Sequence, residues 1–309
     1  MQENRKTKQA QRWMNTMSYT GAMTAIVTPI MYGEIDILGL NNLIKFQLQG
    51  GINGIVPCGT TGESATLSMA EQEVVIRQTV KRVNGQIPVI AGAGANNTAE
   101  ALELTAVAQN VGADAILSIS PYYNRPSQEG IKRHFLEIAD RYDIPMILYN
   151  VPSRTGSNIT PETVACLAQH PNIIGIKEAS GDLRQISEII QSTPNAFIVL
   201  SGDDFTALPT IAIGGQGVIS VTSNIVPRQM TVMIQNGLRG YFQQACQEHE
   251  ALFPLMQAMF NYPSPAPAKK ALELMRVIQV GELRLPMTEM DKYSEEKLIT
   301  LMKDMELIF

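Results

Sequence analysis

Short β-branched runs alternate with longer helical patterns along most of the chain, and this alternation restricts the fold more than any other feature of the sequence. Such alternation is typical of βαβ units around a parallel sheet. We expect eight strands, over residues 22–28, 54–57, 88–91, 115–118, 146–150, 173–177, 197–200 and 217–220. Because no GxGxxG motif marks a dinucleotide crevice, these units predict an α/β fold of the (β/α)8 TIM-barrel type.

The two ends of the chain fall outside this alternation. Residues 1–20 are basic but lack an apolar core, so we expect a disordered leader; the remnant of a targeting segment is the alternative. The barrel is expected over residues 21–226. Residues 227–309 predict an all-helical C-terminal appendage, with helices over 241–260 and 267–280 separated by a proline cluster.

Two helix starts are marked by local signals. Ser68 is followed three residues later by Glu71, which predicts a capping box. Thr160 precedes Pro161, and proline is favoured at the first position of a helix. Both signals fall where the alternation predicts helices.

Charge and residue spacing exclude several classes of function. The net charge is −5 and no basic stripe follows the first residues, which disfavours a nucleic-acid partner. No apolar run approaches the length of a membrane span, so no membrane association is expected. The three cysteines and three histidines are scattered, without the spacing of a disulfide framework or a zinc site. We therefore expect a soluble, cytoplasmic, metal-independent protein.

Lys177 ends the apolar run of the sixth expected strand, at the end of the barrel where active sites form. Burial there favours the neutral amine, which can attack a ketone to give an imine. Tyr149 ends the fifth strand, so its phenol is expected beside the lysine, where it could relay protons. The alternatives are a lysine that snorkels into solvent or pairs with Glu178, and a tyrosine that belongs to the core.

Three other segments that follow strands carry groups suited to small acids or to interfaces. Thr60 and Thr61 lie in a glycine-bounded turn that could bind a carboxylate, or could satisfy its own backbone. Arg154 could hold a second carboxylate in bidentate fashion, or form a surface salt bridge. Tyr122 and Tyr123 form an exposed aromatic loop of the kind found at interfaces.

Six separated motifs resemble the 4-hydroxy-tetrahydrodipicolinate synthase (dihydrodipicolinate synthase) family, within the superfamily of pyruvate-dependent Schiff-base aldolases and N-acetylneuraminate lyases. The resemblance runs from about residue 21 to 290, in the family's order and spacing. The motifs are GTTGE at 59–63, PYYNRP at 121–126, YNVPSRTG at 149–156, GIKEASGD at 175–182, LSGDD at 200–204 and GVISVTSN at 217–224.

The resemblance implies an enzyme that condenses pyruvate with L-aspartate 4-semialdehyde through an imine on Lys177. Tyr149, Thr60 and Tyr123 would form a proton relay, with Tyr123 entering the site of a neighbouring subunit. No cofactor would be needed. The implied assembly is a homodimer that pairs into a homotetramer.

The resemblance also implies which residues bind ligands. Pyruvate would be held by Thr61, Gly202 and Ile219, and the carboxylate of the semialdehyde by Arg154. An allosteric site for L-lysine, a feedback inhibitor, would consist of Ser64, Ala65, Asn96, Glu100 and Tyr122. Met69 and Gln72 depart from the family pattern at positions where strongly inhibited members often carry histidine, which leaves the strength of inhibition open.

Two other functions remain as alternatives. A lyase of the same fold, acting on a sugar acid such as N-acetylneuraminate, would share the lysine, the tyrosine and the glycine-rich turn. Arg154 and the double tyrosine favour the synthase over this lyase. A non-catalytic barrel that senses a 2-oxo acid would be expected to lack Lys177, Tyr149 or Thr60, and all three are present.

Overall fold

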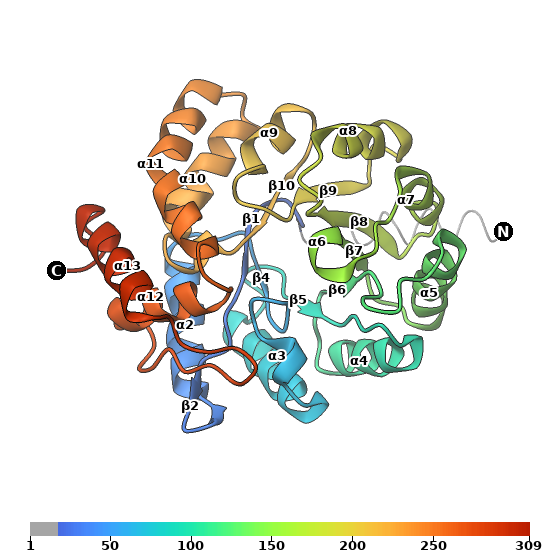
Figure 1. The fold of residues 1–309 in the computed structure, drawn as a ribbon. Coiled ribbons are helices and arrows are strands. Elements are labelled where there is room, and N and C mark those ends of the chain that lie inside the picture. Colours follow the sequence, from blue (N-terminus) through green and yellow to red (C-terminus); the bar gives the residue numbers. More distant parts are fainter. Residues whose placement is uncertain (1–17) are drawn as a thin grey trace.

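The predicted barrel is the architecture of the folded chain. The computed structural model describes residues 18–309, in which eight parallel strands form one sheet around a central axis (Figure 1). A single parallel bridge between Ile55 and Val89 joins the two ends of this sheet. In their order around the barrel the strands are β4 (Gly54–Val56), β1 (Gly21–Ala25), β10 (Gly217–Ser220), β9 (Ile198–Ser201), β8 (Ile173–Glu178), β7 (Met146–Asn150), β6 (Ala115–Ile119) and β5 (Ile90–Gly92).

Helices follow the strands and cover the outside of the barrel (Figure 1). The capping box predicted at Ser68 is confirmed, because its hydroxyl accepts from the Glu71 amide at 3.3 Å and the Glu71 carboxylate accepts from the Ser68 amide at 2.8 Å. The helices that cover the barrel are α2 (Ile37–Gln49), α3 (Met69–Val83), α4 (Thr98–Asn110), α5 (Gln128–Arg141), α7 (Pro161–Leu167), α8 (Leu183–Ser192), α9 (Ala207–Ala212) and α10 (Pro227–Leu238).

Several short elements follow the C-terminal ends of strands and were not expected from the sequence. They are the hairpin β2 (Ile30–Met31) and β3 (Glu34–Ile35), helix α6 (Pro152–Thr155), and two 3₁₀ helices over Ser64–Thr66 and Thr222–Asn224. Each is too short to show a hydrophobic period. Together they build up the end of the barrel at which a TIM-barrel active site forms.

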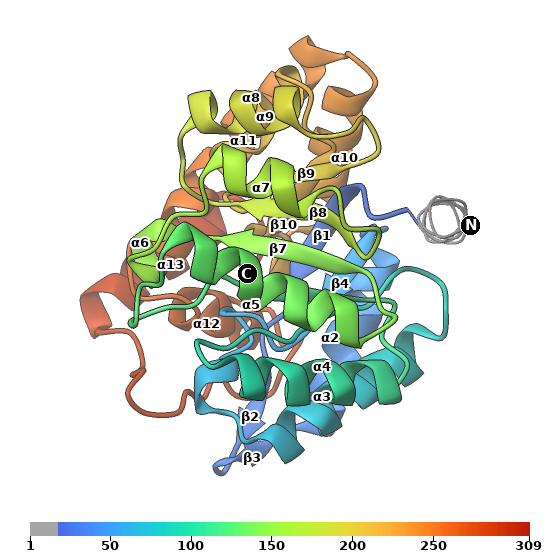
Figure 2. The ribbon, with the colours of Figure 1, turned by 90° about the vertical axis from the view of Figure 1, so that its right-hand side faces the viewer.

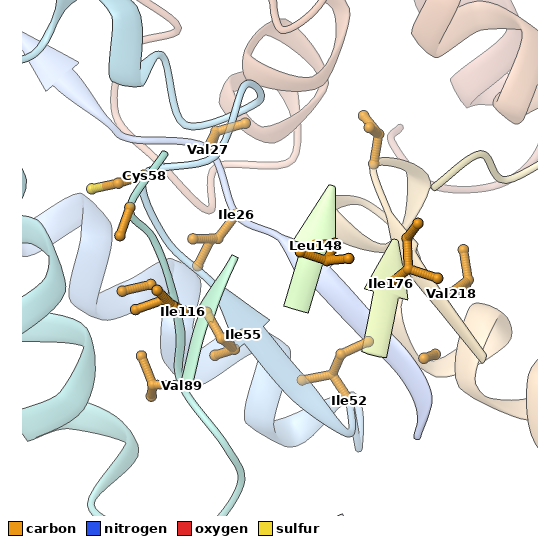
Figure 3. Packing of buried hydrophobic residues seen from close by; sticks show 14 of the residues in the cluster. Ile26, Val27, Ile52, Ile55, Cys58, Val89, Ile116, Leu148, Ile176 and Val218 are labelled. Atoms are coloured by element: carbon orange, nitrogen blue, oxygen red, sulfur yellow. The ribbon is translucent and has the colours of Figure 1, made fainter. Parts of the chain in front are cut away.

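Side chains of the strands divide between two hydrophobic clusters. The outer cluster lies between the sheet and the helices, and Figure 3 shows Leu148 and Ile176 within it. The inner cluster fills the barrel and includes Ile147 and Leu200. Successive side chains of a strand point to opposite faces. The residues that follow Leu148 and Ile176, Tyr149 and Lys177, therefore point into the barrel.

Beyond α10, which packs on β1, the chain continues as α11 (Phe242–Phe260), α12 (Ala266–Leu274) and α13 (Lys292–Asp304), as the helical pattern predicts. Helix α12 ends at Leu274 rather than at residue 280, because the chain turns there and Arg276 takes a left-handed φ of 59°. Figure 2 shows α12 and α13 at the same end of the barrel as α6.

The predicted leader lies mostly outside the described residues, since only residues 18–20 of it are described. Tyr19 is buried, and its hydroxyl donates to the Asp114 carbonyl at 2.9 Å. Within residues 18–309, no helix combines the length and hydropathy that a membrane span requires.

Arg284, in the segment after α12, ties the C-terminal region to the start of α3. Its guanidinium donates to the Thr66 carbonyl at 3.0 Å and pairs with the Glu71 carboxylate. The hydrogen bond from Arg284, supported by those from Ser68, lowers the pKa of Glu71 from 4.5 to about 2. This interaction therefore stabilises the fold above pH 4.5 and is lost as the pH falls toward 2.

We expect Glu71→Gln to lower the melting temperature at pH 7, and the difference from the wild type to shrink as the pH falls below 4.5. Thermal unfolding followed by circular dichroism over this range measures it. Glu73→Gln is the control, because Glu73 lies on the same helix with its side chain partly exposed and, within residues 18–309, forms an ion pair only with Arg77, four residues away. A difference for Glu71→Gln that stays constant from pH 7 to pH 2 would contradict the assignment.

Candidate active site

A cavity of 210 Å³ opens at the C-terminal ends of the strands. Its walls bring together six of the residues singled out in the sequence, although they come from four separate segments: Thr60, Thr61, Tyr149, Arg154, Lys177 and Gly202. Segments far apart in the chain meet here because all parallel strands of a barrel end at the same face. This cavity is the candidate active site.

Lys177 lies inside the barrel and is only 6% exposed. It pairs in register with Tyr149 of β7, and its Nζ lies 4.3 Å from the centroid of the tyrosine ring. Both alternatives for the lysine are therefore wrong. Its side chain faces the cavity inside the barrel rather than the outer surface, and Glu178 points to the opposite face of the strand, where it bonds to Asn150.

Gly202 follows β9 and packs directly against the lysine. Its amide donates to the Glu178 carbonyl at 2.7 Å. A Cβ at this position would lie 2.6 Å from the Cβ of Ala179 and 3.0 Å from the Cε of Lys177. Glycine is favoured here, because a Cβ would clash with Ala179 and crowd the stem of the lysine.

Thr60 and Thr61 lie in a tight turn after β4. The turn is closed by two backbone hydrogen bonds of 3.1 Å, from Gly62 to the Gly59 carbonyl and from Glu63 to the Thr60 carbonyl. Thr61 is buried, and no side-chain hydrogen bond ties either threonine hydroxyl to its own turn. The hydroxyls are thus available to a ligand in the cavity.

A buried ion pair fixes this turn to the C-terminal region. Glu63 has a left-handed φ of 56° and its carboxylate contacts Nζ of Lys269, which is 0% exposed in α12. The same ammonium donates to the Glu282 carbonyl at 2.7 Å. A buried charge is stable only when it is paired and hydrogen-bonded. The C-terminal helices are therefore part of the support of the Thr60–Thr61 turn.

Arg154 belongs to α6 and lines the cavity from its solvent-facing side. Among the described residues it forms no ion pair, so the surface salt bridge considered as an alternative is absent there. Its guanidinium is exposed and beside Ser153. Its five donors are available for a planar carboxylate.

Two of the eight residues predicted for catalysis and substrate binding do not line this cavity. Tyr123 is 90% exposed, with a left-handed φ of 70°, and its amide donates to the Thr155 carbonyl at 3.3 Å. Ile219 is buried in β10, within the inner hydrophobic cluster. The described chain therefore contains the lysine, tyrosine and threonines of the candidate site, but its own Tyr123 lies apart from them.

A second cavity of 540 Å³ lies beside the first and shares Thr60, Tyr149 and Arg154 with it. Four of the five residues expected to bind L-lysine line it: Ser64, Ala65, Glu100 and Tyr122. The fifth, Asn96, donates from its amide to the Tyr122 carbonyl at 3.2 Å. Burial, and then the negative charge of Glu100, raise the pKa of Tyr122.

Seven residues of the smaller cavity were not singled out in the sequence, among them Asp203, Phe260 and Ser264. Asp203 follows β9, and its place in the LSGDD motif was the only signal that could have indicated it. Burial raises the pKa of Asp203, whereas the charge of Lys177 opposes that rise. Phe260 and Ser264 come from the C-terminal helical region, where no strand marks a residue as close to the site.

The chain is similar to known proteins in both sequence and structure. A family model described as the dihydrodipicolinate synthetase family matches residues 18–305. The 4-hydroxy-tetrahydrodipicolinate synthase of Desulfotalea psychrophila is 56% identical over 290 residues, which are 94% of this chain and 98% of that protein. The dihydrodipicolinate synthase of Acinetobacter baumannii, solved in complex with pyruvate, superimposes with a TM-score of 0.92 at 41% identity, over 94% of this chain and 100% of that one. The enzyme of Cyanidioschyzon merolae, solved with lysine bound, gives a TM-score of 0.91 at 40% identity, over 94% and 99% of the two chains.

Proposed function

The chain belongs to the dihydrodipicolinate synthetase family, and on this basis we propose how its own residues carry out the family's reaction. It is a lyase that condenses pyruvate with L-aspartate 4-semialdehyde to 4-hydroxy-tetrahydrodipicolinate, in the biosynthesis of diaminopimelate and lysine. The observation that carries the proposed mechanism is the buried Lys177 beside Tyr149, in one cavity with two threonines and an arginine.

The reaction starts at the Lys177 amine. It attacks the ketone carbon of pyruvate, and loss of water leaves an imine. A proton leaves the pyruvate methyl group to give an enamine, whose carbon attacks the aldehyde carbonyl of the second substrate. The amino group of that substrate then displaces the lysine, so that the ring closes and the free amine returns. No bound cofactor is required, because the protonated imine accepts the electrons.

The other residues move protons and hold carboxylates. Tyr149, with Thr60, relays protons during formation and breakdown of the imine, supported by its position next to Lys177. Thr61, Gly202 and the backbone near Ile219 hold pyruvate. Arg154 binds the carboxylate of the semialdehyde, which its exposed guanidinium at the edge of the cavity supports.

We expect Arg154→Met to raise KM for the semialdehyde by about ten- to a hundredfold, the scale of a lost hydrogen-bonded charge, and to leave imine formation with pyruvate intact. Steady-state kinetics with each substrate varied in turn measures it.

The wild type should consume the semialdehyde with pyruvate far faster than it cleaves N-acetylneuraminate. The reverse preference would indicate the sugar-acid lyase and remove Arg154 from the site.

Tyr123 completes the relay across a homodimer in our proposal. Its exposure on a loop with a left-handed backbone supports insertion into a neighbouring subunit. Two such dimers would pair into a homotetramer.

We also propose that the enzyme works in the cytoplasm, which the free state of Cys58, Cys166 and Cys246 supports.

L-lysine is proposed to bind the larger cavity, with its ammonium on the Glu100 carboxylate. The expected result is that millimolar L-lysine slows turnover of the wild type, and that Glu100→Gln weakens this inhibition several-fold without changing the uninhibited rate. Initial rates over a series of lysine concentrations test it. Unchanged rates and an unchanged melting temperature with lysine would contradict a lysine site here.

A further inference from the structure

Behind Lys177 and Tyr149, on the outer face of the barrel wall, lies a second pair of side chains. Asn150 follows Tyr149 and Glu178 follows Lys177, and the two pairs are adjacent in the register of β7 and β8. Because side chains alternate along a strand, Asn150 and Glu178 point away from the cavity. They lie at the same level of the barrel as the reacting groups but line neither of the two cavities.

The Glu178 carboxylate is the acceptor for a set of amide donors. Asn150 Nδ2 donates to its two oxygens at 3.1 and 2.9 Å. Gln185 Nε2 of α8 donates to Oε2 at 3.2 Å, and the Ser180 amide donates to Oε1 at 2.7 Å. One carboxylate thus joins the end of β7, the loop after β8 and the start of the next helix.

The same network reaches the loop that follows Arg154. Asn158 Oδ1 accepts from Asn150 Nδ2 at 2.8 Å and from Gln185 Nε2 at 3.1 Å, and Asn158 Nδ2 donates to Gln185 Oε1 at 2.8 Å. The Ile159 amide donates to Asn150 Oδ1 at 3.0 Å. The side chain of Asn150 therefore fixes both its own strand and the loop after α6.

This arrangement is costly for general stability. Glu178 is 1% exposed, and no Lys, Arg or His among the described residues forms an ion pair with it. Burial raises the pKa of Glu178, and the bonds from Asn150, Ser180 and Gln185 counteract that rise. Burying an apolar side chain between a sheet and its helices would cost less free energy. What the carboxylate supplies instead is a defined position for three donor groups.

We propose that Glu178 and Asn150 are positioning residues, which fix the ends of β7 and β8 so that the Lys177 amine stays beside Tyr149 and the loop of Arg154 stays over the cavity. This inference rests on the proposed imine chemistry. Placement errors of about 1 Å at a reacting group can cost a hundredfold in rate. Neither residue lines the cavity, so its effect must pass through Lys177, Tyr149 or Arg154.

Isosteric substitutions test the donor–acceptor pattern directly. Glu178→Gln turns an amide donor toward the donors of Asn150 and Ser180, and Asn150→Asp puts a second carboxylate against Glu178. The double variant Asn150→Asp/Glu178→Gln reverses the pair at nearly constant volume. It restores a donor–acceptor match between positions 150 and 178, while Ser180 or Gln185 still loses its acceptor. The readout is the rate at which pyruvate and borohydride modify the intact enzyme, measured beside the melting temperature and the separate kcat and KM values.

We expect each single variant to trap pyruvate ten- to a hundredfold more slowly than the wild type, and the double variant to recover part of that loss, because it restores the bond between positions 150 and 178. Asn172→Asp is the matched control, because Asn172 lies buried at the other end of β8 and donates to the Ala139 and Tyr142 carbonyls at 3.0 and 3.1 Å. It should lower the melting temperature and leave the trapping rate unchanged.

Single variants that trap at the wild-type rate would overturn the proposal, and so would a double variant as slow as the single ones. A control variant slowed to the same degree would show that loss of stability alone explains the effect. If a single variant does not fold, Gln185→Leu, which removes the bonds of the Gln185 side chain to Glu178 and Asn158 and leaves the Asn150–Glu178 pair unchanged, must still slow trapping. A wild type that is not trapped at all would refute the imine chemistry instead, and so identify which of the two claims had failed.

Discussion

Lys177→Met is expected to reduce kcat by about 10⁴-fold or more, the scale that follows removal of a covalent nucleophile. Methionine has nearly the length and volume of the lysine stem, so it should occupy the buried site beside Tyr149 without an amine that can attack pyruvate. The fold should not suffer, since the substitution removes a buried charge rather than creating one. Turnover with both substrates, measured beside the melting temperature, tests this expectation.

Lys269→Met serves as the contrast for this prediction, because Lys269 is the other buried lysine among the described residues and does not line the cavity. The folded fraction of the Lys269→Met variant should still be modified by pyruvate at Lys177. Substantial residual turnover in Lys177→Met would mean that another amine performs the chemistry, and the proposed role of Lys177 would then be wrong.

The second large effect is expected on stability. Lys269→Met should lower the free energy of unfolding by about 3–5 kcal/mol, because it leaves the Glu63 carboxylate buried without its cation. Urea unfolding measures the change. The double variant Glu63→Gln/Lys269→Met should recover a large part of the loss, since it removes the unpaired charge as well as its partner.

Lys270→Met is the matched control, because the adjacent lysine is partly exposed and pairs with Glu273 and Glu295 at the surface. Surface pairs contribute only about 0–1 kcal/mol. Equal losses for Lys269→Met and Lys270→Met would contradict a special role for the buried pair. So would a double variant less stable than Lys269→Met alone.

Much of the barrel could be predicted because its strands are buried on both faces and separated by helices with readable starts. The predicted and observed strand at residues 146–150 coincide, and the capping box at Ser68 is present. Lys177 and Tyr149 could be placed because strand ends in a barrel share one face. The hairpin of β2 and β3 could not be predicted, since strands of two residues have no hydrophobic period to detect.

Contacts between distant segments could not be predicted from the sequence for a different reason. Lys269 lies in a helix whose pattern gives no sign that its ammonium is buried against Glu63. Phe260 and Ser264 reach the cavity only because α11 and α12 fold back over the barrel mouth. Glu178 was considered only as a partner for Lys177, whereas the pleat of β8 turns it toward Asn150 and Gln185. These positions depend on tertiary packing rather than on local pattern.

The central claim is that pyruvate is held covalently by Lys177, and borohydride reduction of the wild-type enzyme with pyruvate tests it most directly. Intact mass spectrometry should show one pyruvate-derived addition per chain, and peptide mapping should assign it to Lys177. Omission of either pyruvate or borohydride should leave the mass unchanged. An unmodified chain after the complete treatment, or an addition located on a different lysine, would contradict the account.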